Sequence, residues 1–192
     1  MRRVVPTFVL LGALALAGCA ADTSTKDTAT SAPTTAPATT AAPLTPSASG
    51  SASAKPAVPG RLAFTAKTLD GAAFDATILA GKPVVLWFWA PWCPKCRAAG
   101  PEVAKTAEKH QGKVAVVGVA GLSDDTDSMR GFVAATKTGE MTHLADGTGA
   151  VWKRFGVTAQ HTYVLIGADG GVIHKGALSN NELERRVAAL AG

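Results

Sequence analysis

Cysteine and clustered basic charge are both scarce in this chain of 192 residues. It has three cysteines and four histidines, with one close cysteine pair and no close histidine pair, so a closed structural zinc site lacks ligands. Its 19 Lys and Arg residues outnumber its 14 Asp and Glu residues. They are scattered and form no basic run, which argues against nucleic acid as a partner. No repeat of solenoid length is present, and one folded domain is expected.

The single long apolar run lies at the N-terminus. It follows two arginines and ends at Gly18, which is the layout of a secretory signal peptide over residues 1–18. Leu16-Ala17-Gly18-Cys19 resembles the lipobox of bacterial lipoproteins, and this resemblance implies that Cys19 is lipidated and becomes the mature N-terminus. The alternative is an ordinary signal peptide with a chance cysteine. The lipobox implies an extracytoplasmic protein, lipid-anchored to the cell membrane.

Residues 19–60 consist almost entirely of Ala, Thr, Ser and Pro. Such a segment has no large apolar side chains to bury, so we expect a disordered tether. The folded domain is expected over residues 61–192.

Within that domain, short β-rich runs alternate with helical patterns, which indicates an α/β fold. The expected strands cover 62–67, 72–74, 83–89, 114–119, 162–166 and 172–175. The expected helices cover 93–110, 127–137 and 148–155, with a closing helix whose capping box joins Ser179 and Glu182. The first two strands flank a turn and predict a hairpin.

The close cysteine pair, Cys93 and Cys96, falls where the most apolar strand ends and a helix begins. Residues three apart share one helix face, so the two thiols can form a disulfide. Pro94 suits the first helical position and leaves Cys93 at or next to the N-cap. Free N–H groups there, together with Lys95, favour a Cys93 thiolate, so Cys93 is the expected nucleophile and Cys96 the resolving thiol. A purely structural disulfide is the plainer alternative, although so short a loop constrains little chain entropy.

The stretch V-V-L-W-F-W-A-P-W-C-P-K-C, Val84 to Cys96, resembles the active-site signature of thioredoxin-fold proteins. The resemblance extends over about 61–192. It is greatest to the extracytoplasmic TlpA/ResA/DsbE (redoxin) branch, and within it to secreted actinobacterial DsbE-like proteins. It implies a central mixed β-sheet flanked by helices, an N-terminal β-hairpin extension, and Trp92 beside the dithiol. It also implies a membrane-tethered thiol–disulfide oxidoreductase without a cofactor, which exchanges disulfides with exported proteins and is reset by a membrane redox partner. Both directions of exchange, oxidation and reduction, stay open.

Two positions depart from the thioredoxin pattern. Trp87 stands where cytoplasmic thioredoxins have a buried Asp, and His161 stands where the family has a cis-proline. A non-proline cis bond costs about 2.5–4 kcal/mol, so we expect a trans bond before His161. His161-Thr162 also resembles Sco-type copper proteins, which gives an alternative function: copper binding by Cys93, Cys96 and His161. The Sco cysteines are one residue further apart, and this argues against that alternative. Otherwise no metal is expected.

Overall fold

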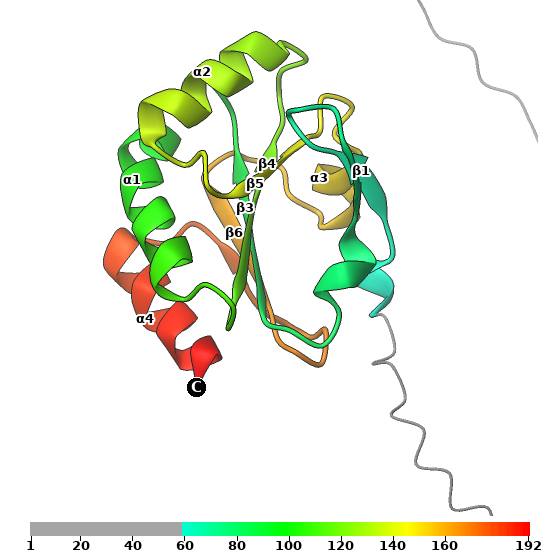
Figure 1. Cartoon of the computed structure of the whole chain (residues 1–192), viewed down its shortest axis with the longest axis vertical. Helices are drawn as coiled ribbons and strands as arrows, with labels where there is room; N and C mark the ends of the chain where they lie inside the picture. Colours follow the sequence, from blue (N-terminus) through cyan, green and yellow to red (C-terminus); the bar gives the residue numbers. More distant parts are fainter. Residues whose placement is uncertain (1–58) are drawn as a thin grey trace, which may run out of the picture. The chain divides into compact units, whose positions relative to one another are not determined.

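The structure is a computed structural model that describes residues 59–192. The predicted signal peptide, the lipidation site Cys19 and nearly all of the predicted tether lie outside the described residues. A five-stranded mixed sheet in the order β5-β4-β3-β6-β7 forms the centre of the domain (Figure 1). The strands are β1 Thr65–Lys67, β2 Ala73–Asp75, β3 Val84–Trp89, β4 Ala115–Ala120, β5 Thr142–Ala145, β6 Thr162–Ile166 and β7 Val172–Gly176. The α-helices are α1 Pro94–Lys109, α2 Thr126–Thr136, α3 Ala150–Arg154 and α4 Asn180–Ala191, and the short 3-10 helices are η1 Gly60–Leu62 and η2 Ala76–Leu79.

Strand β3 is the centre of both the sheet and the core. It pairs in parallel with β4 and antiparallel with β6, and all six of its side chains are buried. Successive side chains of a strand point to opposite faces, so β3 supplies two apolar clusters. Val85, Trp87 and Trp89 join the cluster under α1, α2 and α4. The other three side chains join a second cluster. This burial on both faces explains the continuous apolar run of the sequence.

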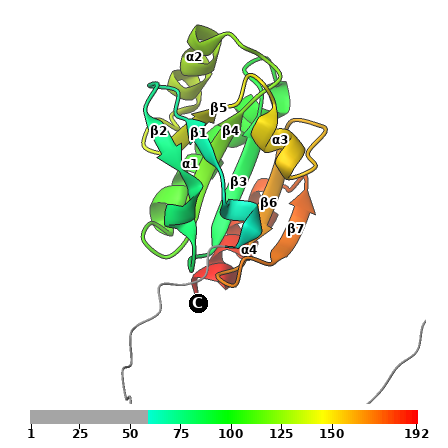
Figure 2. The ribbon, with the colours of Figure 1, turned by 90° about the vertical axis from the view of Figure 1, so that its right-hand side faces the viewer.

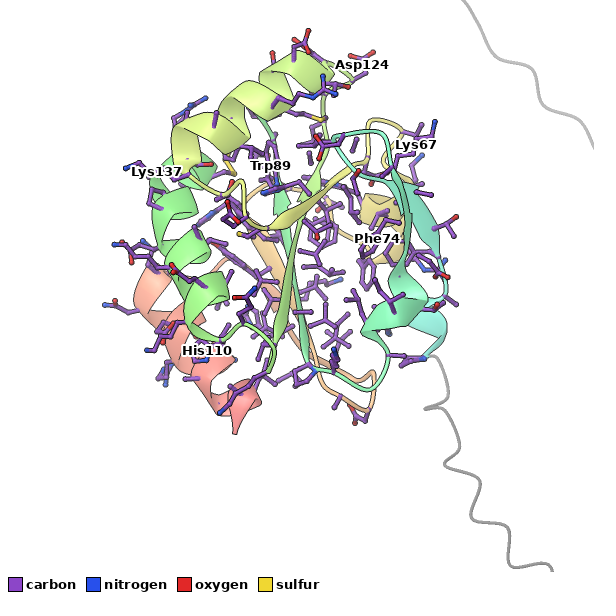
Figure 3. The ribbon with its side chains drawn as sticks, in the orientation of Figure 1. Lys67, Phe74, Trp89, His110, Asp124 and Lys137 are labelled. Atoms are coloured by element: carbon purple, nitrogen blue, oxygen red, sulfur yellow. A yellow bond between two sulfur atoms is a disulfide. The ribbon has the colours of Figure 1, made fainter. Side chains whose placement is uncertain are left out.

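The two faces of the sheet carry different layers. Helices α1, α2 and α4 cover one face, whereas α3 and the β1–β2 hairpin lie on the other (Figures 1 and 2). Figure 3 shows Trp89 on the side of the long helices and Phe74 between the hairpin and the sheet. The hairpin is a separate two-stranded sheet. This arrangement is the thioredoxin fold with the N-terminal hairpin extension that the sequence predicts.

The helix ends explain where each helix begins. Asp125 accepts the backbone N–H groups of Asp127 and Ser128 at the start of α2, and Ser179 accepts that of Glu182 at the start of α4. Side-chain acceptors of this kind satisfy N–H groups that have no partner within the helix. The predicted capping position of Ser179 is therefore confirmed.

An ionic contact joins the end of α1 to α4. Glu184 accepts hydrogen bonds from Lys109 and pairs with His110 at 3.1 Å. The bonds from Lys109 and then His110 lower the pKa of Glu184 to about 2. Figure 3 labels His110 at this end of α1. The contact fixes the C-terminal helix against the helix that begins at Cys93. No helix within residues 59–192 is long and apolar enough to cross a membrane.

Two sequence-based elements differ clearly from the structure, whereas the other boundaries shift by no more than two residues. The first predicted strand begins at Thr65 rather than at residue 62, because residues 60–62 form the 3-10 turn η1. Strand β5 was not predicted at all. It has four residues, and its buried pair is His143 and Leu144. A polar residue inside so short a strand interrupts the apolar alternation on which strand prediction depends.

Gly118 of β4 allows a close approach between the sheet and two core rings. A Cβ atom at this position would lie 2.1 Å from His143 Nδ1 and 2.9 Å from Trp89 Nε1. Trp89 stacks on Phe132 with ring centroids 4.2 Å apart and makes an edge contact with His143. Both rings are buried, so either must shift within the core to make room for a Cβ atom.

We therefore expect Gly118→Ala to destabilise the protein. Overpacking of a tight core lowers the unfolding free energy by about 1–3 kcal/mol, and urea unfolding of the oxidised protein measures the change. Gly131→Ala in α2 is the control, because a Cβ there meets no atom within 4 Å. An alanine in a helix is favoured over glycine by up to about 1 kcal/mol, so the control variant should be at least as stable as the wild type. Equal stability of the two variants would contradict the packing argument.

Candidate active site

The cysteine pair lies at the junction between β3 and α1. Strand β3 ends at Trp89, a short turn follows in which the Cys93 N–H donates to the Ala90 carbonyl, and α1 begins at Pro94. Cys93 is the N-cap, and its Sγ accepts the backbone N–H of Cys96 at 3.0 Å. The predicted positions of Cys93, Pro94 and Cys96 relative to the helix are confirmed. A sulfur in this place faces the positive end of the helix dipole and an unpaired N–H group.

The two cysteines form a disulfide with Cα atoms 5.3 Å apart. Both sulfurs belong to the core cluster under α1, and the exposed fractions are 2% for Cys93 and 0% for Cys96. In the oxidised state the expected nucleophile Cys93 is therefore almost as buried as Cys96. Access to its Sγ must come through the small exposed fraction that remains or through movement of the surrounding residues.

Basic side chains accompany the start of α1. Lys95 is exposed, and the Arg97 guanidinium donates to the Pro91 carbonyl at 3.2 Å while it lies 5.4 Å from the centre of the Phe132 ring. Arg97 thus fixes the turn before Cys93. Positive charge and helix end act in the same direction, since both stabilise a thiolate over a thiol.

An exposed apolar pair lies beside the disulfide. Trp92 is 56% exposed and Leu122, in the loop after β4, is 50% exposed. The Trp92 indole N–H donates to the Leu122 carbonyl at 3.3 Å, and Leu122 has a positive φ of 56°. That conformation is costly for a branched residue. The surface is hollowed next to this pair over about 370 Å³, with Arg97, Ser128 and Phe132 in the lining. Sequence analysis identified Trp92 but missed Leu122, because nothing in the sequence marks a loop leucine as exposed.

His161 immediately precedes β6, in the loop that faces the start of α1. Its neighbour Thr162 pairs with Phe88 near the end of β3. The Thr162 hydroxyl donates to the Ala159 carbonyl at 2.8 Å, which holds the loop in a turn. His161 has a positive φ of 60°. Proline is restricted to a φ near −65°, so this loop does not have the conformation of a proline-containing loop.

The imidazole of His161 is half-buried. It makes an edge contact with the Tyr163 ring, with centroids 5.6 Å apart, and its Nδ1 is shielded from solvent without a hydrogen-bond partner. Burial, and then the nearby positive charge of Lys95, lower the pKa of His161. The pairing of Thr162 with Phe88 places this loop at the end of β3 that leads into α1, and the nearby charge of Lys95 agrees with that position.

Trp87 occupies the position where thioredoxins have an acid. It is fully buried, and its ring stacks on Tyr163 with an interplanar angle of 11°. Burial also raises the pKa of Tyr163. The strand beneath the disulfide thus offers large rings and no carboxylate, so proton exchange from this strand is not available at neutral pH.

The copper alternative finds little support. Among residues 59–192, no group of three His, Cys, Asp or Glu side chains is arranged to hold a metal ion. Cys93 and Cys96 are joined as a disulfide, and a disulfide offers no thiolate to a soft metal.

Comparisons with known proteins agree with this geometry. The Redoxin family profile matches residues 34–190. The chain belongs to the Redoxin family. The soluble secreted antigen MPT53 of Mycobacterium tuberculosis is 42% identical over 134 residues, which cover 68% of this chain and 76% of that protein. A Yersinia pestis thiol:disulfide interchange protein, DsbE, is 33% identical over 135 residues, covering 67% of this chain and 69% of that protein.

Solved structures give the same relationship. DsbF of M. tuberculosis, solved in mixed oxidised and reduced forms, is 48% identical with a TM-score of 0.65, covering 70% of this chain and 99% of that one. A secreted M. tuberculosis disulfide oxidoreductase homologous to DsbE is 42% identical with a TM-score of 0.63, covering 68% and 98%. This Redoxin protein is therefore a thiol–disulfide oxidoreductase of the DsbE-like, thioredoxin-fold type, and the copper alternative is not favoured.

The φ of His161 leads to a prediction about loop stability. Glycine adopts a positive φ freely, whereas proline cannot adopt it. His161→Gly should therefore keep the unfolding free energy within about 1 kcal/mol of the wild type. His161→Pro should lower it by more than about 1 kcal/mol, as measured by urea unfolding of the oxidised protein. A proline variant as stable as the glycine variant would show that the loop refolds to accept proline, which contradicts the prediction.

Proposed function

We propose that the protein exchanges disulfides with exported proteins through Cys93 and Cys96. The observation that carries this proposal is the Cys93 Sγ at the N-cap of α1, bonded to Cys96 and accepting its N–H. Cys93 is the residue that attacks or is attacked by the partner protein. Cys96, one helical turn deeper and fully buried, closes the disulfide and releases the partner.

The exposed pair Trp92 and Leu122 supports a polypeptide partner. Two large apolar side chains held next to a reactive sulfur offer a contact for apolar residues that flank a cysteine in an unfolded chain. The adjacent hollow with Arg97 and Ser128 can accept polar or acidic groups of the same segment. A small disulfide such as oxidised glutathione would use little of this surface.

The same proposal places the protein outside the cytoplasm, attached to the membrane by a lipid on Cys19. Its support is the lipobox-like sequence at Cys19 and the relative that is named as a secreted antigen. A membrane redox partner would then reset the dithiol. The helix end and Lys95 stabilise the Cys93 thiolate, hence the reduced form, and this makes the pair more oxidising.

The roles of the two cysteines can be separated by trapping. In the reduced protein, Cys93 should react with iodoacetamide before Cys96 at mildly acidic pH, because only its sulfur faces the helix end. Cys96→Ser should accumulate mixed disulfides through Cys93, whereas Cys93→Ser should form none. Mass spectrometry of alkylated peptides and non-reducing gels measure both. Trapping through Cys96 in the Cys93→Ser variant would contradict the assignment.

The test of the function itself is disulfide exchange with a protein substrate. Wild-type protein should catalyse insulin reduction or oxidation of a reduced, unfolded protein at a rate that both cysteine variants lose. A surface control is Ile173→Asn on β7. Ile173 is 55% exposed and lies on an edge strand away from Cys93. The Ile173→Asn variant should leave the rate unchanged.

Cys19 should act only as the anchor. Cys19→Ser should move the protein from the membrane fraction to the soluble fraction and leave exchange by the Cys93–Cys96 pair unchanged, because a lipid anchor adds membrane affinity and no redox chemistry. Fractionation and the insulin assay measure the two properties. A soluble variant without exchange activity would refute this separation of roles.

A further inference from the structure

The position of His161 follows from the register of β6 and from one ring contact. His161 directly precedes Thr162, which pairs with Phe88 one residue before the end of β3, the strand that leads into Cys93. Its ring contacts Tyr163, and Tyr163 belongs to the same core cluster as Cys93 and Cys96. His161 therefore lies at the end of the sheet from which β3 passes into α1, and the nearby charge of Lys95 in α1 agrees with this position.

Three polar atoms of the aromatic residues around Tyr163 have no hydrogen-bond partner. His161 Nδ1, Tyr163 Oη and Trp87 Nε1 are all shielded from solvent without a hydrogen-bond partner. No protein group satisfies these three atoms, so each can take a further hydrogen-bond partner, such as a water or a reacting thiol. The tyrosine and the tryptophan can donate a proton to a hydrogen bond, but of the three only an imidazole nitrogen can take up a proton at neutral pH.

The exchange reaction needs such a proton acceptor. Cys96 is fully buried, and burial in apolar surroundings favours the neutral thiol. It must lose its proton before it can attack the mixed disulfide at Cys93, because the thiolate is the nucleophile. Trp87 supplies no carboxylate for this step.

We propose that His161 is the general base that takes the proton of the Cys96 thiol. This inference rests on the proposed function and deepens it. As the S–H proton passes to His161 Nδ1, directly or through one water, the Cys96 sulfur attacks Cys93 Sγ. The Cys93–Cys96 bond forms, and the bond between Cys93 and the partner sulfur breaks. The partner leaves as a thiolate and receives the proton from the imidazolium. In the opposite direction, His161 returns the proton to Cys96 as that sulfur leaves.

The protonation state of His161 suits this role. Burial and the Lys95 charge lower its pKa, so the imidazole is neutral at neutral pH and its base form is available. The titratable groups against it are Lys95 from α1 and Tyr163 from β6, and neither is negatively charged at that pH. The base is lost only when the pH falls through the lowered pKa of His161.

The resolving step can be observed separately with 5,5′-dithiobis(2-nitrobenzoate). We would use the full chain with Cys19→Ser, so that Cys93 and Cys96 are the only thiols. Attack by Cys93 on the reagent releases a first coloured thiolate, and attack by Cys96 on the mixed disulfide releases a second. The leaving group needs no proton, so the second phase reports deprotonation of Cys96.

His161→Gly and His161→Asn keep the loop backbone, since both residues tolerate a positive φ. We expect the second phase to slow by about 10²-fold at pH 7 in both variants, the lower end of the effect of a general base. The difference should become smaller as the pH rises, because a growing fraction of the Cys96 thiol then ionises without help. Rates within twofold of the wild type at pH 7 would overturn the proposal. A loss that persists at high pH would also overturn it, because that result indicates a structural role.

Two further measurements fix the assignment. His174→Asn is the matched control, because His174 is also half-buried with an unpartnered nitrogen but lies on β7. This variant should leave both phases unchanged. A slowed second phase would overturn the assignment to His161.

Lys95→Met should raise the pKa of His161, and the acid limb of the second phase should move to higher pH. An unshifted limb would overturn the placement of His161 against Lys95. If the Cys19→Ser chain with His161 intact releases no second thiolate, the proposed function itself fails, whatever the His161 variants do.

Discussion

The continuous passage from β3 into α1 is the constraint on which the rest of the domain depends. Six buried residues fix β3 between β4 and β6, and only four residues separate its end from the start of α1. The Cys93 sulfur therefore caps a helix whose position is set by the core. Because the helix end is rigid, its unpaired N–H groups act on the sulfur without a cost of reorganisation, which is the arrangement that favours a thiolate.

The sequence predicted this junction well because strong local signals coincide there. The apolar run of β3, the position of Pro94 and the cysteine spacing each have one structural meaning, and all agree. Prediction failed for features that depend on contacts between distant parts of the chain. Strand β5 exists because its backbone pairs with β4, although its sequence lacks an apolar pattern. The Leu122 side chain is exposed and its carbonyl accepts the Trp92 indole N–H. This contact spans 30 positions, and no local pattern reveals it.

The burial of Cys93 limits which molecules can reach the disulfide of the oxidised protein. A sulfur that is 2% exposed gives a small disulfide or thiol little advantage, since any reagent must displace its neighbours. A polypeptide that first contacts Trp92 and Leu122 gains apolar burial on the protein surface, at about 25 cal/mol per Å². The binding energy of these contacts can then offset the free-energy cost of displacing the residues around Cys93. Burial of the sulfur and exposure of the two rim residues thus select for protein partners.

The departures at Trp87 and His161 are linked through Tyr163. Trp87 stacks on one side of the Tyr163 ring and His161 makes an edge contact with it, so the three aromatic groups form one packed unit beneath the disulfide. A carboxylate at position 87 would be desolvated among these rings, at a cost that raises its pKa and removes its charge. An imidazole at the rim suffers less, because it is only half-buried and is neutral near pH 7. This core therefore accommodates an aromatic residue at position 87 together with a proton acceptor at position 161. It does not accommodate a charged acid at position 87.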